Sequence, residues 1–310
     1  MSPARRRKTR KRKSKKKGER KVIYKILFWI LVLLAIFLVF RLTTKYWNNV
    51  SKLTLVSPQE NGDIQVSTFD PKADSIRVVV IPKDTQIRVA RQLGTWRIKS
   101  VWELGENEGL NGQLLSESVT KQFKIPVYVW GDVKVSGFSS SKAAKVIKST
   151  ILPYKTNLGI GDRVRLGMFS LGVKNFKRET TDLSDTKVLE RTVLVDGSAG
   201  YKVVGDLPSS IVAIYSDPYL SSVSAKTQIV DATSDAVVAK EVGEIVEVVG
   251  LKVTSIENVE VNNELDCIVS GKDKELTKTI SQLFSCDIKN REEDNFDLII
   301  QMGEEFVKRF

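Results

Sequence analysis

The chain has 310 residues and a formal net charge of +12, with 49 basic and 37 acidic side chains. It contains no histidine and only two cysteines, which excludes a serine–histidine catalytic triad, an imidazole metal site and a four-thiolate metal site. The excess charge lies in residues 1–21, which hold thirteen Lys or Arg and one acid, Glu19. Residues 22–310 are therefore neutral as a whole.

An uncharged apolar run, residues 26–40, follows this basic tail. With its flanks, the apolar stretch covers residues 22–42, a length that matches a hydrocarbon core about 30 Å thick. Trp47 lies just beyond it, as in an aromatic belt, and no small-x-small signal-peptide cleavage site follows. The sequence therefore predicts a single-pass helix in the cell membrane, with residues 1–21 in the cytoplasm and residues 46–310 extracytoplasmic.

The basic tail has two interpretations. Lys and Arg at this density can neutralise the phosphates of a nucleic acid or those of anionic lipid headgroups. The tail has no interleaved aromatic residues, and no folded module is predicted on its side of the membrane. We therefore expect it to set the orientation of the chain and to contact lipid headgroups, and we expect no nucleic-acid partner.

Residues 46–206 are expected to form the first extracytoplasmic domain. Strands are predicted at 52–56, 64–69 and 75–81, and the last is an unbroken β-branched run typical of a strand buried on both faces. An apolar-periodic helix is predicted at 110–123. Alternating strands and helices indicate an α/β class.

A second, smaller α/β domain is predicted at residues 226–310, after a linker at 207–225 marked by prolines and serines. Its first helix ends at Gly250, a residue that favours the left-handed conformation of a helix C-terminus. The expected pattern is βαβ followed by βαβ, with later strands at 251–256, 265–269 and 297–302. The sequence leaves open whether residues 133–215 form a third unit or complete the first domain.

Three motifs in residues 50–150 resemble the catalytic domain of the LytR-CpsA-Psr family. Residues 81–85 read I-P-K-D-T where the family has I-P-R-D-T, and residues 97–102 read R-I-K-S-V-W where the family has K-I-N-x-A-Y. Residues 116–129 stand where the family has a helix and a following strand. Residues 226–302 resemble the LytR C-terminal domain often appended to that family.

The resemblance implies a role in the bacterial cell envelope. Active members attach polymers carried on polyprenyl pyrophosphate to the cell wall. This chemistry needs cations on the pyrophosphate and a carboxylate-held Mg²⁺. Carried over by position, Lys83, Asp84 and Arg97 would contact the pyrophosphate, with Arg163 and Arg165 as weaker candidates. No residue is assigned as catalytic.

Departures from the family motifs argue against catalysis. Lys83 replaces an arginine and so loses the planar fork that holds phosphate at two points. The family's R-S-D-T segment has no counterpart, and its later arginine-rich element is reduced to Arg163 and Arg165. Each lost charged hydrogen bond is worth about 1.5–3 kcal/mol. We therefore expect a domain that binds or scaffolds cell-wall polymer or its polyprenyl-linked precursor, without a cofactor or a metal.

Two other functions remain open. An active phosphotransferase would use Lys83, Asp84, Arg97 and Mg²⁺. A membrane-bound transcriptional attenuator, which the family's older naming implies, would need residues 1–21 to bind DNA specifically. In the expected binding or scaffolding protein, the second domain serves as an interaction module for the wall or for an envelope protein partner.

Cys267 and Cys286 are the only cysteines. Cys267 lies on a predicted strand, and Cys286 follows the next predicted helix. An extracytoplasmic pair on adjacent elements can form a disulfide if the two Cα atoms lie within about 7 Å. The alternative is a pair of small buried apolar residues.

Overall fold

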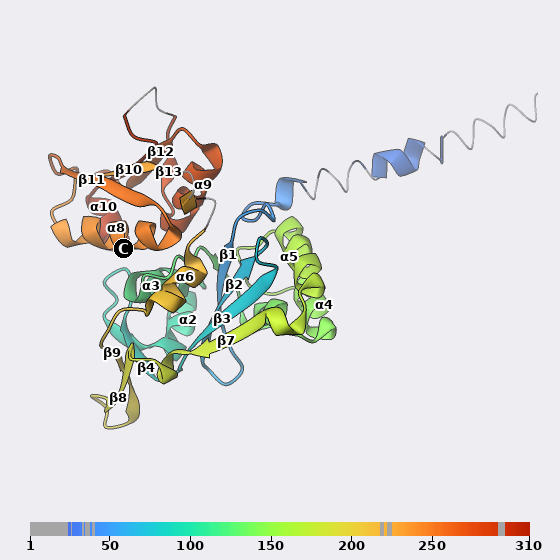
Figure 1. Ribbon diagram of the computed structural model, residues 1–310, viewed down its shortest axis with the longest axis horizontal. Coiled ribbons are helices and arrows are strands. Elements are labelled where there is room, and N and C mark those ends of the chain that lie inside the picture. The colour runs from blue at the N-terminus through green and yellow to red at the C-terminus, as the bar shows by residue number, and fades with distance from the viewer. Residues whose placement is uncertain are drawn as a thin grey trace, which may run out of the picture.

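The computed structural model describes residues 24–25, 27–32, 34, 38, 41–217, 220–221, 225–290 and 295–310. The predicted basic tail lies outside the described residues, as does part of the predicted span at 22–42. Over the part of the chain that is described, no helix is both long and apolar enough to cross a bilayer. The predicted α/β class is confirmed, since three mixed sheets are covered by helices (Figure 1).

The first unit is built on a five-stranded sheet in the order β6-β1-β2-β3-β7. Its central strands form an antiparallel meander, and both edge strands run parallel to their neighbours. The three predicted strands are confirmed to within two residues, because their β-branched runs are buried. The bounds are β1 Leu53–Pro58, β2 Ile64–Asp70, β3 Ser75–Ile81, β6 Val129–Trp130 and β7 Arg178–Asp182.

Helices cover both faces of this sheet (Figure 1). One face packs against α2 Ile98–Asn107 and α3 Gln113–Phe123, and the other packs against η1 Val133–Ser139, α4 Ala143–Ile151 and α5 Ile160–Gly172. The alternation of side chains in β1 divides the two cores: Val56 belongs to the first, and Leu53 and Leu55 belong to the second. The helix predicted at 110–123 begins at Gln113, after a turn around Gly112.

A second sheet of the same unit has the order β5-β4-β9-β8. Its strands are β4 Thr85–Arg88, β5 Thr95–Arg97, β8 Leu189–Val193 and β9 Ala199–Val203, and the short helices η2 Asn175–Lys177 and η3 Leu183–Asp185 flank β7. Because β7 pairs with β3 and β9 pairs with β4, residues 133–215 complete the first unit. Helix α6 Ser209–Tyr215, inside the expected linker, packs on the first core through Ile211 and Ile214.

The second unit has the sheet order β11-β10-β14-β12-β13. Its elements are β10 Lys226–Asp231, α8 Ala236–Val249, β11 Lys252–Asn258, β12 Cys267–Gly271, α9 Lys274–Phe284, β13 Asp287–Ile288, β14 Leu298–Met302 and α10 Glu304–Arg309. Gly250 has φ +108°, which confirms the left-handed end of α8.

The prediction of a second βαβ repeat is wrong about one element, the strand that closes the repeat. Strand β13, which directly follows the left-handed Ser285, pairs parallel to β12 and closes the repeat. Strand β14 is antiparallel to β12 and parallel to β10. Its apolar sequence Leu298–Met302 is almost entirely buried, so burial favours the central place between these two strands.

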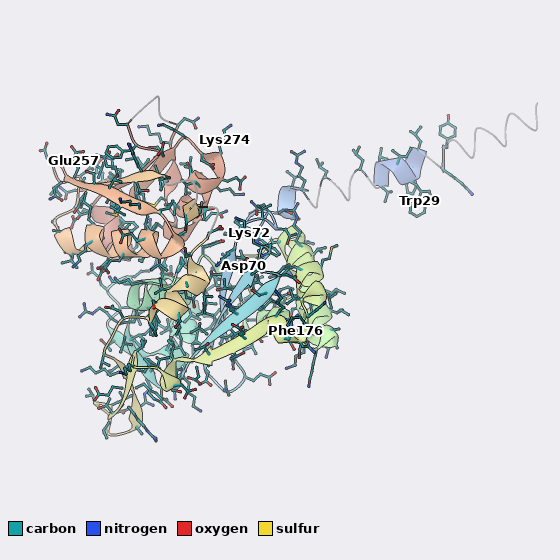
Figure 2. All side chains as sticks on the ribbon, viewed as in Figure 1. Trp29, Asp70, Lys72, Phe176, Glu257 and Lys274 are labelled. Carbon is teal, nitrogen blue, oxygen red and sulfur yellow. A yellow bond between two sulfur atoms is a disulfide. The ribbon has the colours of Figure 1, made fainter. Side chains whose placement is uncertain are left out.

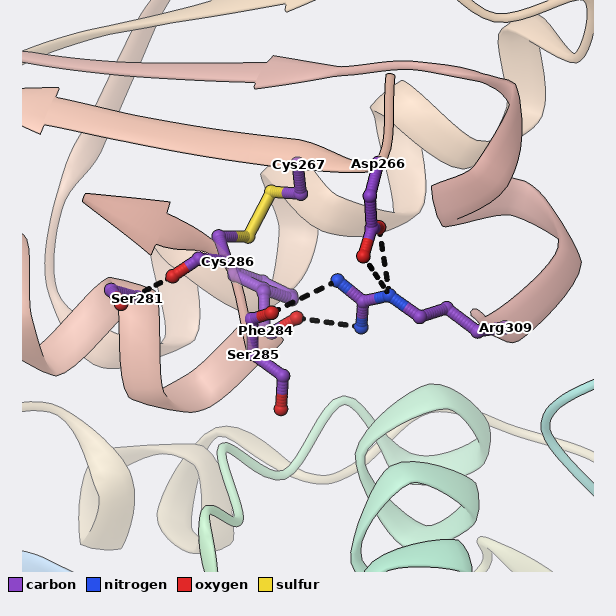
Figure 3. The surroundings of a disulfide bond; sticks show 7 residues. All are labelled: Asp266, Cys267, Ser281, Phe284, Ser285, Cys286 and Arg309. Carbon is purple, nitrogen blue, oxygen red and sulfur yellow. Dashed lines mark hydrogen bonds and ion pairs between the residues drawn. A yellow bond between two sulfur atoms is a disulfide. The ribbon is translucent and has the colours of Figure 1, made fainter. Parts of the chain in front are cut away.

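Cys267 and Cys286 are joined in a disulfide, with a Cα–Cα distance of 4.7 Å (Figure 3). Arg309 of α10 closes the same corner of the unit. Its Nε donates to the Asp266 carboxylate at 2.8 Å, and its Nη1 donates to the carbonyl oxygen of Phe284 at 2.8 Å. The C-terminal helix is therefore tied to both ends of the segment that the disulfide closes.

Candidate functional site

The motif residues Lys83, Asp84 and Arg97 come together at one edge of the first unit. Pro82 ends β3, and a turn closed by Thr85 N–H donating to the Pro82 carbonyl at 3.0 Å leads into β4. Arg97 ends β5, which pairs antiparallel with β4, and α2 begins at the next residue. The hairpin therefore brings Arg97 back beside Asp84.

Asp84 is held by two cations. Its Oδ1 accepts from Nη1 of Arg97 at 3.0 Å and from Nζ of Lys99, in the first turn of α2, at 2.8 Å. The second Arg97 nitrogen, Nη2, donates to Asp196 Oδ2 and to Ser198 Oγ. We call Lys83, Asp84, Arg97, Lys99 and Asp196 the Asp84 cluster. In this cluster, the carboxylates of Asp84 and Asp196 both contact Arg97, the arginine expected to hold phosphate.

Lys83 is fixed through its backbone. Its N–H donates to Asp63 Oδ1 at 2.8 Å, and its carbonyl accepts from Lys99 N–H at 3.2 Å. Its stem runs over Gly62, where an added Cβ would lie 3.4 Å from Lys83 Cδ. Among the described residues no carboxylate forms an ion pair with Lys83, so this lysine is the unpaired cation of the cluster.

A carboxylate in this state does not fit Mg²⁺. The Lys99 hydrogen bond, followed by the charge of Lys99 and the contact with Arg97, lowers the pKa of Asp84 below its usual value. Asp84 is therefore an anion whose charge is already neutralised by nitrogen donors, whereas Mg²⁺ needs free oxygen ligands. Within the described ranges, no three acidic or cysteine side chains gather as a metal site.

The dominance of Lys99 over Arg97 can be measured. We expect Lys99→Ala to raise the pKa of Asp84 more than Arg97→Ala does, in a carboxyl-carbon NMR titration. Because the folded-state pKa is lowered, the stabilisation from Asp84 is complete above its unfolded pKa and is lost as the pH falls through the folded value. An equal or larger rise in Arg97→Ala would contradict this order.

Arg163 and Arg165 do not join the Asp84 cluster. Both lie on α5, on the opposite face of the main sheet from α2. The Arg163 guanidinium stacks 4.2 Å from the centroid of the Tyr154 ring and donates to two backbone carbonyls. Arg165 Nη1 donates to the Trp47 carbonyl at 3.0 Å. Both arginines therefore hold α5 to its neighbours.

A basic cleft lies where the second sheet meets the end of α3 and helix α8, next to the Asp84 cluster. Four cations line it, namely Arg88, Lys121, Lys124 and Lys202, and its volume is about 420 Å³. Gln86, also in its wall, pairs with Arg97 on one side and with Lys202 on the other. Directly paired residues project to one face, so the cleft continues the side of the sheet on which Arg97 lies.

Burial and neighbouring cations change the pKa of a lysine in this cleft. Burial lowers the pKa of Lys121, and the charges of Arg88 and Lys124 add to that lowering. Glu241 of α8 is the acid in the cleft wall, and it lies 3.8 Å from Lys124. Among the described residues, Arg88 and Lys202 form no ion pair. The family motifs do not point to this site, because its four cations come from β4, from α3 and the residue that follows it, and from β9, which are far apart in sequence.

An apolar cavity of about 240 Å³ lies between the two units. Leu220, Val249, Leu276 and Leu283 form part of its wall. Ion pairs border it: Lys52 Nζ lies 3.3 Å from Asp70, and Lys72 Nζ lies 3.9 Å from Asp217. Asp70 ends β2 and Lys72 follows it, and both are labelled in Figure 2. These contacts hold the start of β1 and the end of β2 against the segment that joins the units.

No family model matches the chain, and no curated protein matches it. Several solved structures are similar. TagV of B. subtilis is 13% identical with a TM-score of 0.37, over 51% of this chain and 92% of that chain. TagT bound to LIIa-WTA is 13% identical with a TM-score of 0.37, over 52% and 88%. The "LytR-CPS2A-psr family protein YwtF (TagT) with bound octaprenyl pyrophosphate lipid" is 13% identical with a TM-score of 0.36, over 52% and 87%. One of these neighbours, YwtF (TagT), is described as a protein of the LytR-CpsA-Psr family, which is the family that the motifs of the first domain resemble.

Proposed function

We propose that this chain is a single-pass cell-envelope protein whose extracytoplasmic part binds or scaffolds an anionic cell-wall polymer or its lipid-linked precursor, without transferring it. The observation that carries the proposal is a difference in ion pairing between two neighbouring groups of cations. In the Asp84 cluster, Arg97 and Lys99 are neutralised by carboxylates of the chain itself. In the adjoining basic cleft, Arg88 and Lys202 line the wall and form no ion pair with any residue that the structure describes.

The Asp84 cluster is poorly suited to phosphoryl transfer. Transfer from a pyrophosphate needs cations aimed at the developing charge and, in this family, a carboxylate that holds Mg²⁺. Here Asp84 accepts from both Arg97 and Lys99, and a substrate would have to break these ion pairs before either cation could bind phosphate. The cost of that exchange offsets the gain from binding.

The basic cleft suits a negatively charged chain. It is open, it runs along the sheet face that carries Arg97, and its wall contains one acid against four bases. Structural neighbours are named as bound to wall teichoic acid and to octaprenyl pyrophosphate lipid. A polymer of phosphodiester units would match the spacing of several cations along one groove.

Binding can be tested with the full-length protein in nanodiscs and a synthetic poly(glycerol phosphate) chain as the probe. We expect Arg88→Ala and Lys202→Ala each to weaken binding about tenfold, the effect of losing one charge-assisted contact of about 1.4 kcal/mol. Each should also reduce the salt dependence of the affinity. The matched control is Lys278→Ala, an exposed lysine on α9. Equal affinities in all three variants would contradict the proposed site.

The same preparation separates scaffolding from catalysis. With a short-chain polyprenyl pyrophosphate donor and Mg²⁺, we expect no release of polyprenyl phosphate. Turnover that disappears in a Lys83→Ala, Arg97→Ala double variant would instead establish the phosphotransferase alternative.

A further inference from the structure

Helices α4 and α5 present an apolar outer face. Each buries one side against the main sheet, through Val146 and Leu166 respectively. On the other side, large apolar side chains recur at helical spacing and are exposed. They are Ile147, Ile151 and Leu152 at the end of α4, Ile160, Met168 and Leu171 on α5, and Phe176 just beyond. Ile151, Met168 and Phe176 are each at least 70% exposed. We call these seven residues the α4–α5 face.

Basic residues far outnumber acidic ones in the segment that carries this face. Residues 133–178 contain ten of the 33 basic side chains of residues 46–310 but only one of the 36 acidic ones. That acid, Asp162, is fully buried, so it does not face outward. Lys142 at the start of α4, and Lys145 and Lys148 within it, are exposed. Exposed apolar side chains flanked by lysines are typical of a helix that lies in the interface of a lipid bilayer.

The N-terminus of α5 holds the residues that follow the apolar run 26–40. The Asp162 carboxylate accepts from the backbone N–H groups of Lys45, Tyr46 and Trp47 at 3.0–3.2 Å. Gly161 N–H donates to Thr43 Oγ1 at 3.0 Å. Figure 1 shows this segment entering the first unit beside α5. The α4–α5 face is therefore fixed close to the point where the predicted membrane span would end.

We propose that the α4–α5 face rests on the surface of an anionic lipid bilayer, beside the chain's own anchor. Ile151, Met168 and Phe176 enter the interfacial layer, and the lysines of α4 contact lipid phosphates. The tether at Thr43–Trp47 and the charge complementarity favour a bilayer over a second copy, whose matching face would carry the same positive charge. The inference rests on the proposed membrane anchoring. It orients the first unit with α4 and α5 toward the membrane.

Site-specific labelling of the full chain in nanodiscs tests this inference. Both native cysteines are in the disulfide, so one introduced cysteine is the only reactive thiol. We would attach a polarity-sensitive fluorophore at Met168→Cys or Ile151→Cys. The control is Val195→Cys, which lies 98% exposed in the β8–β9 turn. In discs containing phosphatidylglycerol and nitroxide lipid, we expect quenching at positions 168 and 151 at least threefold stronger than at 195.

Two different outcomes would overturn the inference. Quenching at positions 168 and 151 no stronger than at 195 overturns the inference. So does a blue shift in lipid-free detergent that grows with protein concentration, because that is the signature of a second copy on the face. A Lys142→Gln, Lys145→Gln, Lys148→Gln variant should lose at least half of the difference between anionic and neutral discs.

Failure of the proposed anchoring has its own signature. A chain that elutes free of nanodiscs in high salt is not anchored. The same labels are then read on phosphatidylglycerol vesicles at low salt. Quenching at position 168 there keeps the inference without the anchor, and its absence overturns both.

Discussion

Removing the disulfide is expected to destabilise the second unit by about 3 kcal/mol. Cys267 and Cys286 close a loop with a sequence separation of 19 residues, and cross-linking a loop of that length restricts the unfolded chain by about this free energy. Both sulfur-bearing residues are buried, at 3% and 6% exposure, so their replacement by alanine also leaves unfilled space in the core.

The aromatic composition allows the two units to be followed separately. All tryptophans and tyrosines precede residue 226, and every tryptophan except Trp29 of the predicted span lies in the first unit. An unfolding transition in tryptophan fluorescence therefore reports the first unit, and far-ultraviolet circular dichroism reports both units. In urea, Cys267→Ala, Cys286→Ala should lower the midpoint seen by circular dichroism and leave the tryptophan transition in place. Reductant should reproduce the change in the wild-type chain and have no effect on the variant. A reductant-insensitive wild-type midpoint would contradict the prediction.

Strands with strong local signals were predictable from the sequence. The β-branched run of β3 and the apolar periodicity of α8 each satisfy one dominant burial pattern. Residues 133–215 could not be placed, because β7 is short and polar and β9 is short and mixed in sequence. Their pairing with β3 and β4 depends on contacts more than 90 residues away. The prediction of the direction of β14 was wrong for a related reason. Burial of its apolar side chains favours the position of β14 between β10 and β12, and the order of elements in the sequence does not determine that position.

The candidate site was predictable only where its residues share a hairpin. Asp84 immediately precedes β4 and Arg97 ends β5, and the two meet through the local pairing of these strands. Asp196 and Ser198 arrive from the β8–β9 turn, about one hundred residues later, and only the D-G turn signal at Asp196 marked that loop. Arg163 was grouped with the phosphate contacts because sequence spacing does not reveal on which face of a sheet a helix packs.

Asp162→Ala is expected to be the most damaging single substitution in the first unit, with a loss of about 3–4 kcal/mol. The carboxylate is fully buried and accepts from four backbone N–H groups, those of Lys45, Tyr46, Trp47 and Gly159. Each buried donor left without an acceptor costs about 1–3 kcal/mol, and the four losses are not additive because part of the segment can move out to water.

The stability of Asp162→Ala is measured from the tryptophan fluorescence transition in urea, which removal of the disulfide is expected to leave unchanged. Trp47 is 1% exposed and packs edge-to-face on Phe169, with ring centroids 5.4 Å apart, so its fluorescence should shift to the red when the segment is released. Asp162→Asn is the matched control, because one amide oxygen can still accept, and we expect about half the loss. A loss below about 1 kcal/mol in Asp162→Ala would mean that water replaces the carboxylate. Because Asp162 also ties α5 to the end of the predicted span, the same variant should weaken lipid quenching at position 168 while leaving nanodisc retention intact.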